Sequence, residues 1–180
     1  MPKLGVLLVG WGGNNGSTVT AAIAANRRQL HWETRTGTQH ANYLGSVTQA
    51  STINLGPDAS TGLDVFVPLS SVVPMVHPND FVIGGWDISG MNLADAMRRA
   101  QVLEPDLIRQ VEGELKHMVP MPSIYYPDFI AANQSSRADN LIPGNDKHKH
   151  LEQIRADIRN FKKNNNLDKI VVCWTANTER

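Results

Sequence analysis

The 180-residue sequence has very little cysteine and no excess charge of either sign. Its one cysteine, Cys173, has no second thiol in the chain with which to form a disulfide, which fits a reducing compartment. Seventeen basic residues balance seventeen acidic ones, so the chain has no general electrostatic attraction for nucleic acid or for an anionic membrane surface. We therefore expect a cytoplasmic protein that has no nucleic-acid partner.

Long hydrophobic runs are also absent. No apolar stretch approaches the ~20 residues that a membrane-spanning helix needs, so we expect no membrane partner. The apolar segment Leu4–Val9 is followed by no convincing cleavage site, and we interpret it as a buried strand rather than a signal peptide. With 41% hydrophobic residues, the chain is long enough for one domain with a real core.

Strand-like and helix-like segments alternate along most of the chain. Three short, nearly all-apolar runs are typical of strands buried on both faces of a parallel sheet, at 4–9, 81–84 and 169–174. Helical periodicity follows or separates them, at 18–30, 93–103, 105–118 and 151–163. This alternation predicts the α/β class, with a Rossmann-like, doubly wound parallel sheet. Ligands of such sheets bind at the carboxyl ends of the strands.

Local signals predict where the helices begin. Ser17 or Thr18 is a candidate cap for the first helix, and Asn92 for the second. Pro105 suits the first position of the third helix. The segment 31–78 is rich in Gly, Ser, Thr, Asn and Pro, and we expect it to be an irregular excursion of loops and short strands.

The strongest chemical signal is the glycine-rich run Gly10–Gly16, which follows a predicted strand and precedes a predicted helix. Glycine permits a tight turn and lets a pyrophosphate approach without meeting a side chain. The amide groups at the start of the next helix then stabilise the phosphate charge. The match to the G-x-G-x-x-G pattern is imperfect because the third glycine comes one residue late, and a glycine-rich turn without a phosphate remains the alternative.

An acidic residue that binds the ribose usually lies about 20 residues beyond the glycines. Glu33 is the nearest candidate by count, but its surroundings are polar and irregular. Asp87 is much farther along the chain, yet it follows a buried strand, and sheet geometry would place it beside the glycines. We prefer Asp87; an ordinary turn residue is the alternative.

Other polar segments give weaker signals. Asn133–Arg137 carries several hydrogen-bonding groups and a cation, and Thr175–Thr178 follows the last predicted strand, but either could be an ordinary loop. His148 and His150 alternate with lysines, so we interpret them as part of a solvated charged loop and expect no metal site. Cys173 lies in an apolar strand and is interpreted as an inert core thiol.

Five separate segments together resemble the eukaryotic myo-inositol-1-phosphate synthase family, also called inositol-3-phosphate synthases. They are Gly10–Ser17 (GWGGNNGS), Asn42–Thr52 (NYLGSVTQAST), Pro78–Ile88 (PNDFVIGGWDI), Pro122–Gln134 (PSIYYPDFIAANQ) and Trp174–Arg180 (WTANTER). The resemblance covers the chain from Leu4 to Arg180, and its five segments in one order make it far more specific than the glycine run.

The resemblance implies an NAD-dependent isomerisation of D-glucose 6-phosphate to 1D-myo-inositol 3-phosphate, the first step of inositol and inositol-phospholipid biosynthesis. Oxidation, enolisation, intramolecular aldol cyclisation and reduction follow one another, and NAD is regenerated. It also implies a homo-oligomer at full length.

By resemblance, a set of residues is expected to contact NAD, with Asp87 on the adenosine ribose. The set is Gly12, Gly13, Asn14, Asn15, Asp87, Ser123, Ile124, Gln134, Arg137, Thr175, Ala176, Asn177 and Thr178.

The family's catalytic lysines and acids, and its main oligomerisation region, lie beyond the WTANTER motif. We therefore expect residues 1–180 to be the NAD-binding domain alone, with an unfinished sheet, no catalytic residues and no activity of its own. A truncated NAD-binding or regulatory isoform is the alternative. A simple dehydrogenase is less favoured because Tyr125 and Tyr126 have no lysine three or four residues on.

Overall fold

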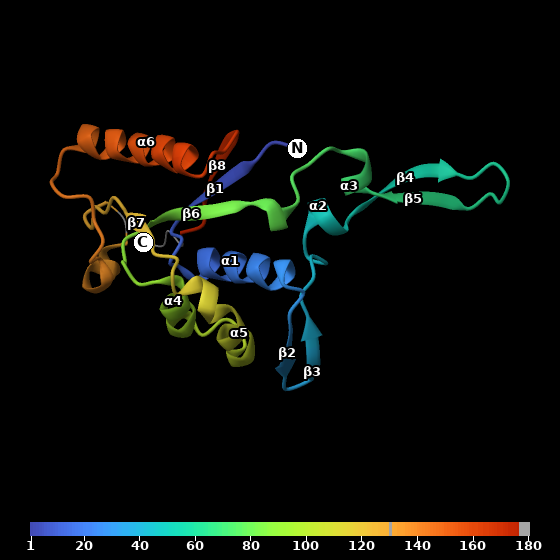
Figure 1. The fold of residues 1–180 in the computed structure, drawn as a ribbon, viewed down its shortest axis with the longest axis horizontal. Coiled ribbons are helices and arrows are strands. Elements are labelled where there is room, and N and C mark those ends of the chain that lie inside the picture. The colour runs from blue at the N-terminus through green and yellow to red at the C-terminus, as the bar shows by residue number, and fades with distance from the viewer. Residues whose placement is uncertain (130, 177–180) are drawn as a thin grey trace.

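Four parallel strands form the central sheet in the computed structural model, which describes residues 1–129 and 131–176 (Figure 1). Their order across the sheet is β7-β6-β1-β8. The strands are β1 (Leu4–Val9), β6 (Val82–Asp87), β7 (Met121–Pro122) and β8 (Lys169–Trp174). All three strand pairs are parallel, so the predicted parallel α/β sheet is confirmed.

The direction in which successive strands are added to the sheet reverses at β1. From β1 the chain crosses to β6 and then to β7 on one side, and it returns to add β8 on the other side of β1. A doubly wound sheet forms its ligand crevice where the strand order reverses, outside the carboxyl ends of the strands. Here that point lies between β1 and β8, next to the glycine run that follows the carboxyl end of β1.

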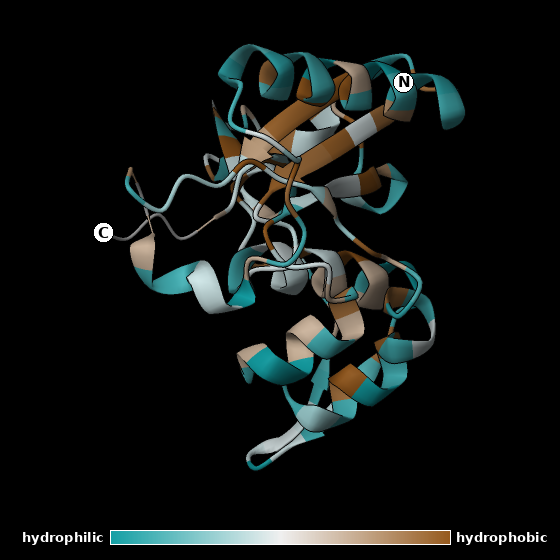
Figure 2. Ribbon diagram, turned by 90° about the vertical axis from the view of Figure 1, so that its left-hand side faces the viewer, coloured by the Kyte–Doolittle hydropathy of each residue, from teal (hydrophilic) through white to brown (hydrophobic). Residues whose placement is uncertain are grey.

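Helices cover both faces of the sheet (Figure 1). One face carries α1 (Asn14–Arg27), α4 (Leu93–Ala100) and α5 (Pro105–Leu115), which pack against one another. The other face carries α6 (Lys147–Asn164), which contacts β1 and β8. Figure 2 shows the apolar strands lying beneath a helix whose outer surface is mostly hydrophilic. None of the helices in the described ranges is both long and apolar enough to cross a bilayer.

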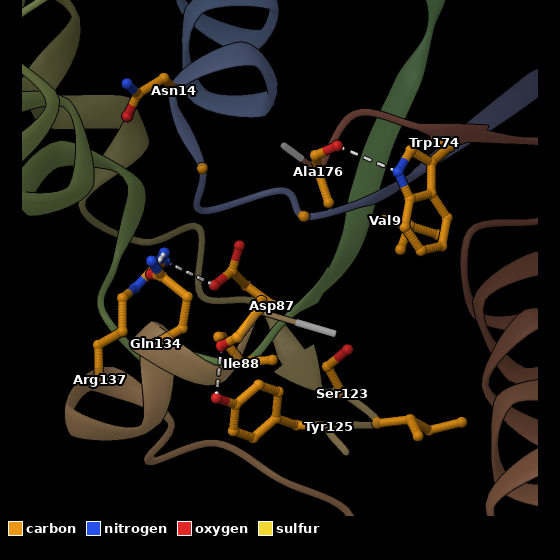
Figure 3. A pocket seen from close by; sticks show the side chains of 14 residues that line it. Val9, Asn14, Asp87, Ile88, Ser123, Tyr125, Gln134, Arg137, Trp174 and Ala176 are labelled. Atoms are coloured by element: carbon orange, nitrogen blue, oxygen red, sulfur yellow. Dashed lines mark hydrogen bonds and ion pairs between the residues drawn. The ribbon is translucent and has the colours of Figure 1, made fainter. Parts of the chain in front are cut away.

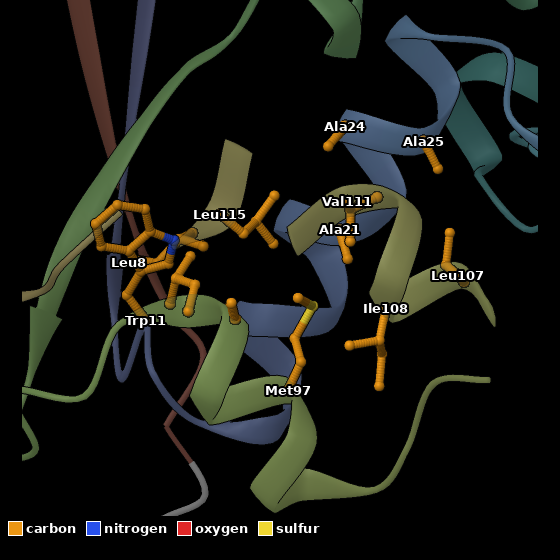
Figure 4. Packing of buried hydrophobic residues seen from close by; sticks show 12 residues of the cluster. Leu8, Trp11, Ala21, Ala24, Ala25, Met97, Leu107, Ile108, Val111 and Leu115 are labelled. Carbon is orange, nitrogen blue, oxygen red and sulfur yellow. The ribbon is translucent and has the colours of Figure 1, made fainter. Parts of the chain in front are cut away.

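The main core lies where α1, α4 and α5 pack against one another and against Leu8 of β1 (Figure 4). Small residues of α1 such as Ala21 are fully buried and let the neighbouring helices approach closely. Met97 and Val111 fill the space from α4 and α5. Trp11 is also buried there, and its indole Nε1 donates to Thr20 Oγ1 at 2.9 Å, so its polar atom is satisfied.

The opposite face is packed less completely. Phe161 of α6 lies over Gly5 and Gly84: a β carbon at Gly84 would come within 2.6 Å of its ring, and one at Gly5 within 2.5 Å of Leu167 Cδ1. Leu151, an apolar residue of the predicted helix 151–163, is 45% exposed, and Val171 and Trp174 of β8 are exposed as well. The helix also begins before the predicted start because Asp146 caps it through the amides of His148 and Lys149.

His150 contradicts the expectation of a solvated charged loop. It lies in the first turn of α6 and is 3% exposed. Its Nδ1 is 2.7 Å from the hydroxyl of Tyr126, and its Nε2 is buried without a partner among the described residues. The helix start at Lys147 turns this side chain inward, which the alternation of His with Lys does not reveal.

Segment 31–78 contains short helices and two antiparallel hairpins (Figure 1). Its elements are β2 (His31–Thr34), β3 (Gly37–His40), α2 (Val47–Ala50), β4 (Thr52–Pro57), β5 (Asp64–Pro68), α3 (Leu69–Val72) and η1 (Pro78–Asp80). The whole segment is inserted in the connection between β1 and β6. It therefore lengthens the chain between these strands without separating them in the sheet.

Two of the three predicted helix starts are confirmed. Asn92 caps α4 by accepting from the amide of Asp95 at 3.1 Å, and Pro105 opens α5. The cap expected at Ser17 or Thr18 is wrong, because α1 begins at Asn14 after Gly13, which has no side chain to cap with. Ser17 lies inside the helix, where its hydroxyl donates to Gly13 O at 2.8 Å.

Replacing Gly85 by alanine is expected to destabilise the fold by about 1–3 kcal/mol, because overpacking costs that much. A β carbon at this position of β6 would overlap the backbone of Leu8 in β1. Gly113→Ala on α5 is the control, since nothing lies within 4 Å of its β-carbon position. That variant should gain about 0.5–1 kcal/mol. Equilibrium denaturation compares the two; equal stability would contradict the packing of β6 on β1.

Candidate dinucleotide-binding site

The glycine run makes a tight turn at the end of β1. Gly10 has a φ of +84°, which favours glycine. The amides of Gly10 and Trp11 both donate to Trp86 O, at 2.8 and 2.9 Å, and Gly13 N donates to Gly10 O at 3.0 Å. The turn is therefore fastened to β6 before α1 begins.

Gly16 lies in the first turn of α1, against the backbone of the glycine loop that precedes the helix. A β carbon there would come within 2.5 Å of Trp11 O and 2.7 Å of Gly10 O. The third glycine is thus needed for close packing of the helix on its own loop, one of the roles of such glycines. Glycine is needed here because the helix backbone touches the loop backbone at this point. A third glycine one residue later than in the G-x-G-x-x-G pattern therefore still serves.

The start of α1 is suited to an anion. The amide groups of a helix's first turn have no acceptor within the helix, and the aligned peptide dipoles place partial positive charge there. Gly13 supplies no side-chain cap, and the first turn contains no acidic residue to neutralise that charge. These properties together suit a phosphate, which commonly binds at a helix N-terminus.

Asp87 stands at the carboxyl end of β6, beside the glycine loop. Its side chain is buried, and its Oδ1 accepts from Ser89 N and from Arg137 Nη2, both at 3.0 Å. A β carbon at Gly12 would lie 3.3 Å from Oδ2. In the described part of the chain Oδ2 has no hydrogen-bond partner, so one acceptor oxygen remains for a ligand next to the loop.

Glu33, the candidate nearest to the glycines in sequence, lies in the β2–β3 hairpin. Its carboxylate accepts from Thr38 Oγ1 at 2.7 Å, within the same hairpin. Asp87 instead follows the strand that pairs with β1, where Val9 lies opposite Trp86. The preference for Asp87 on grounds of sheet geometry therefore agrees with where the two residues lie.

Arg137 connects a second loop to this corner. It ends η2 (Ala132–Arg137), and its Nη1 donates to Gln134 Oε1 at 3.1 Å while its Nη2 pairs with Asp87. Its Nε is buried and has no acceptor in the ranges that the structure describes. The segment is consequently not a freely solvated loop, because its arginine is directed onto a buried carboxylate.

These groups surround one cavity of about 330 Å³ at the carboxyl edge of the sheet (Figure 3). Eight residues expected at the site line it: Gly13, Asn14, Asp87, Ser123, Ile124, Gln134, Arg137 and Ala176. Three others lie beside it and not in its wall: Gly12, Asn15 and Thr175. Asn177 and Thr178 fall outside the described residues.

The three residues beside the cavity hold its walls together. Thr175 donates from both N and Oγ1 to Val9 O, at 2.9 Å each, so the end of β8 is tied to β1. Asn15 Nδ2 donates to Thr175 O at 3.2 Å, which ties α1 to the same point. Gly12 packs on Asp87.

Gly10, from the glycine run, also lines the cavity, and sequence reasoning missed five further lining residues, namely Val9, Ile88, Tyr125, Ala131 and Trp174. Most of them adjoin predicted positions at strand ends, and a rule that included every residue at a strand's carboxyl end would have found them. It also missed Arg99 of α4, whose Nη2 donates to Gly12 O at 2.8 Å. Its position on a helix after β6 gives no local signal of that contact.

Comparison with known proteins identifies the family. The family model described as myo-inositol-1-phosphate synthase, an NAD-binding domain, matches residues 4–180. The chain belongs to the myo-inositol-1-phosphate synthase family. It is 61% identical over all 180 residues to inositol-3-phosphate synthase 1 of Rattus norvegicus and 58% identical to the Drosophila melanogaster synthase.

A solved structure agrees with this membership. The inositol-3-phosphate synthase of Caenorhabditis elegans matches with a TM-score of 0.95 and 54% identity, over 99% of this chain and 35% of that one. The chain spans about a third of the length of the relatives it matches, 32% for both the rat and the fly proteins.

NAD is the cofactor of this domain in the myo-inositol-1-phosphate synthase family, and the structure permits a test of fit. A pyrophosphate needs donors without competing negative charge, which the uncapped start of α1 supplies. A ribose hydroxyl needs an acceptor, and Asp87 Oδ2 is unpartnered among the described residues. The donor and acceptor sets therefore fit a dinucleotide.

Gly16→Ala is expected to weaken NAD binding at least about tenfold, because the β carbon would push the start of α1 away from its loop and misplace the phosphate-binding amides. Gly45→Ala is the matched control, since nothing lies within 4 Å of its β-carbon position. Calorimetric titration with NAD measures both. Unchanged affinity in a folded Gly16→Ala protein would mean that the loop geometry does not serve the cofactor.

Proposed function

We propose that this chain forms the NAD-binding part of an inositol-3-phosphate synthase, which isomerises D-glucose 6-phosphate to 1D-myo-inositol 3-phosphate. Family membership supports the reaction, and the position of Asp87 beside the glycine loop is the observation that supports the site. The proposal includes a cytoplasmic location and homo-oligomers at full length, as the family resemblance implies.

In this proposal each group has a defined task. Gly13, which has no side chain, lets the pyrophosphate approach, the backbone amide of Asn14 at the start of α1 binds it, and Asp87 Oδ2 accepts a hydrogen bond from the adenosine ribose. Ser123, Ile124 and Gln134 line the cavity at the loop side, and Ala176 lines it at the end of β8. The proposed set is completed by Gly12, Asn15, Arg137, Thr175, Asn177 and Thr178.

NAD, when bound, supplies the reversible oxidation of a substrate hydroxyl, which acidifies the neighbouring C–H bond. The chain's own contribution is to orient that cofactor and to shield it. The carboxylate and the guanidinium in the cavity wall, Asp87 and Arg137, are paired with each other at 3.0 Å. In this proposal Asp87 Oδ2 accepts from the ribose and Arg137 pairs with Asp87 Oδ1, so neither group is left as a general base for removing a proton from carbon.

Asp87→Ala is expected to lower NAD affinity by about 10- to 100-fold, the range that follows from losing a hydrogen bond to a charged group. Asp80→Ala is the matched control, because Asp80 is an exposed carboxylate of η1 at the other end of β6. Calorimetric titration with NAD compares both variants with the unaltered protein. Equal affinities of all three would refute the role of Asp87, and no heat with the unaltered protein would leave only the family resemblance.

The 180 residues alone are expected to show no conversion of glucose 6-phosphate, because the cavity that they form lacks a base for enolisation. A coupled assay for inositol phosphate, with NAD in excess, measures this. NAD binding without turnover agrees with the proposal and also with a non-catalytic NAD-binding or regulatory isoform; the two differ in whether the reading frame continues past Arg180. Measurable conversion by the 180 residues would contradict it.

A further inference from the structure

Two arginines, Arg99 and Arg137, lie near the Asp87 carboxylate at one corner of the cavity. Arg137 pairs with Asp87 Oδ1 at 3.0 Å. Arg99 reaches the same corner from α4, where its Nη2 donates to Gly12 O at 2.8 Å, and Gly12 packs against the Asp87 carboxyl. Neither the sequence motifs nor the family resemblance assigns a role to Arg99.

The corner has more donors than acceptors. Arg137 pairs with the carboxylate of Asp87, Arg99 donates to the adjacent carbonyl of Gly12, and Arg137 Nε is buried without an acceptor in the described residues. The pKa of Arg99 is lowered from its ordinary value by partial desolvation first and by the charge of Arg137 second, while Asp87 acts in the opposite direction. The three charges therefore act on one another, and the cations outnumber the anion.

Arg99 itself remains accessible. As a residue it is exposed to solvent, and apart from the carbonyl of Gly12 it has no hydrogen-bond partner among the described residues. Its neighbour Arg98 differs, because it pairs with Asp95 at 2.8 Å and with Glu112 at 2.5 Å. Arg99 thus keeps donors for an anionic ligand that Arg98 does not.

The planar donors of two arginines on either side of Gly12 and Asp87 suit a phosphate group. The proposed function places the adenosine ribose of the dinucleotide at Asp87. A phosphate on the 2′-hydroxyl of that ribose, as in NADP, would reach this corner, and an arginine near the acidic position is the usual partner of that phosphate.

We propose that Arg99 and Arg137 form a latent site for a ribose 2′-phosphate, which Asp87 closes, so that this corner selects NAD over NADP. Asp87 neutralises Arg137 and repels a second anion, which is discrimination by a built-in unfavourable contact. Arg99 determines how strongly a 2′-phosphate is bound once that repulsion is removed. The inference rests on the proposed position of the ribose.

The test uses the full-length protein, freed of nucleotide, and two probes that differ by one phosphate: adenosine 5′-monophosphate and adenosine 2′,5′-bisphosphate. Asp87→Ser removes the repulsion and leaves room for the phosphate, and Asp87→Asn removes the charge while keeping the size and the acceptor for Ser89 N. Calorimetry gives the ratio of the two affinities. Asp87→Ser is expected to shift this ratio toward the bisphosphate by about 10- to 100-fold.

The double variants identify the residue responsible. Asp87→Ser with Arg99→Ala is expected to lose most of that gain, and Asp87→Ser with Arg98→Ala is expected to keep it. A folded Asp87→Ser protein without the gain, or a gain that survives Arg99→Ala, would overturn the inference. If Asp87→Ser does not fold, the same comparison is made in Asp87→Asn, where no shift toward the bisphosphate overturns it equally.

The result is separable from the proposed function. Unaltered protein that binds NAD and fails to gain the bisphosphate preference on substitution refutes only the latent site. Unaltered protein that gives no heat with NAD refutes the ribose position and, with it, both proposals.

Discussion

The pairing of β1 with β6 is the constraint on which the site depends. These two strands lie side by side with Leu8 opposite Gly85 and Val9 opposite Trp86. The glycine loop that follows β1 is therefore fastened to Trp86 O and brought against Asp87, the last residue of β6. The start of α1, where we propose that a pyrophosphate binds, and Asp87, the proposed ribose acceptor, are adjacent because the two strands end at the same edge.

Packing on the face covered by α1, α4 and α5 holds the glycine loop at the carboxyl edge of the sheet. Trp11 enters the core directly after Gly10, and its bond to Thr20 links the loop to α1. Thr175 and Asn15 link the end of β8 to the same region. A binding site held by bonds from several elements keeps its donors in place before the ligand arrives, and this preorganisation lowers the ordering cost of binding.

Individual charges near the site are paired or left in excess locally, although the chain is neutral overall. Asp87 is buried with a cation as its partner, as a buried carboxylate requires. Arg137 and Arg99 together leave a local positive excess around the proposed ribose position, which the equal totals of acidic and basic residues conceal. Net charge thus led us to expect neither nucleic acid nor an anionic membrane as a partner, and it said nothing about this corner.

The amino-acid sequence determined three of the four strands of the sheet, all but β7, together with their alternation with helices, the glycine loop and the family. These features are local: apolar runs, caps such as Asn92, and short motifs are legible residue by residue. The start of α1, the inward turn of His150 and the contact of Arg99 with Gly12 were decided only by the tertiary structure. Each depends on which elements become neighbours, and distance along the chain does not give that, as the insertion of 31–78 between β1 and β6 shows.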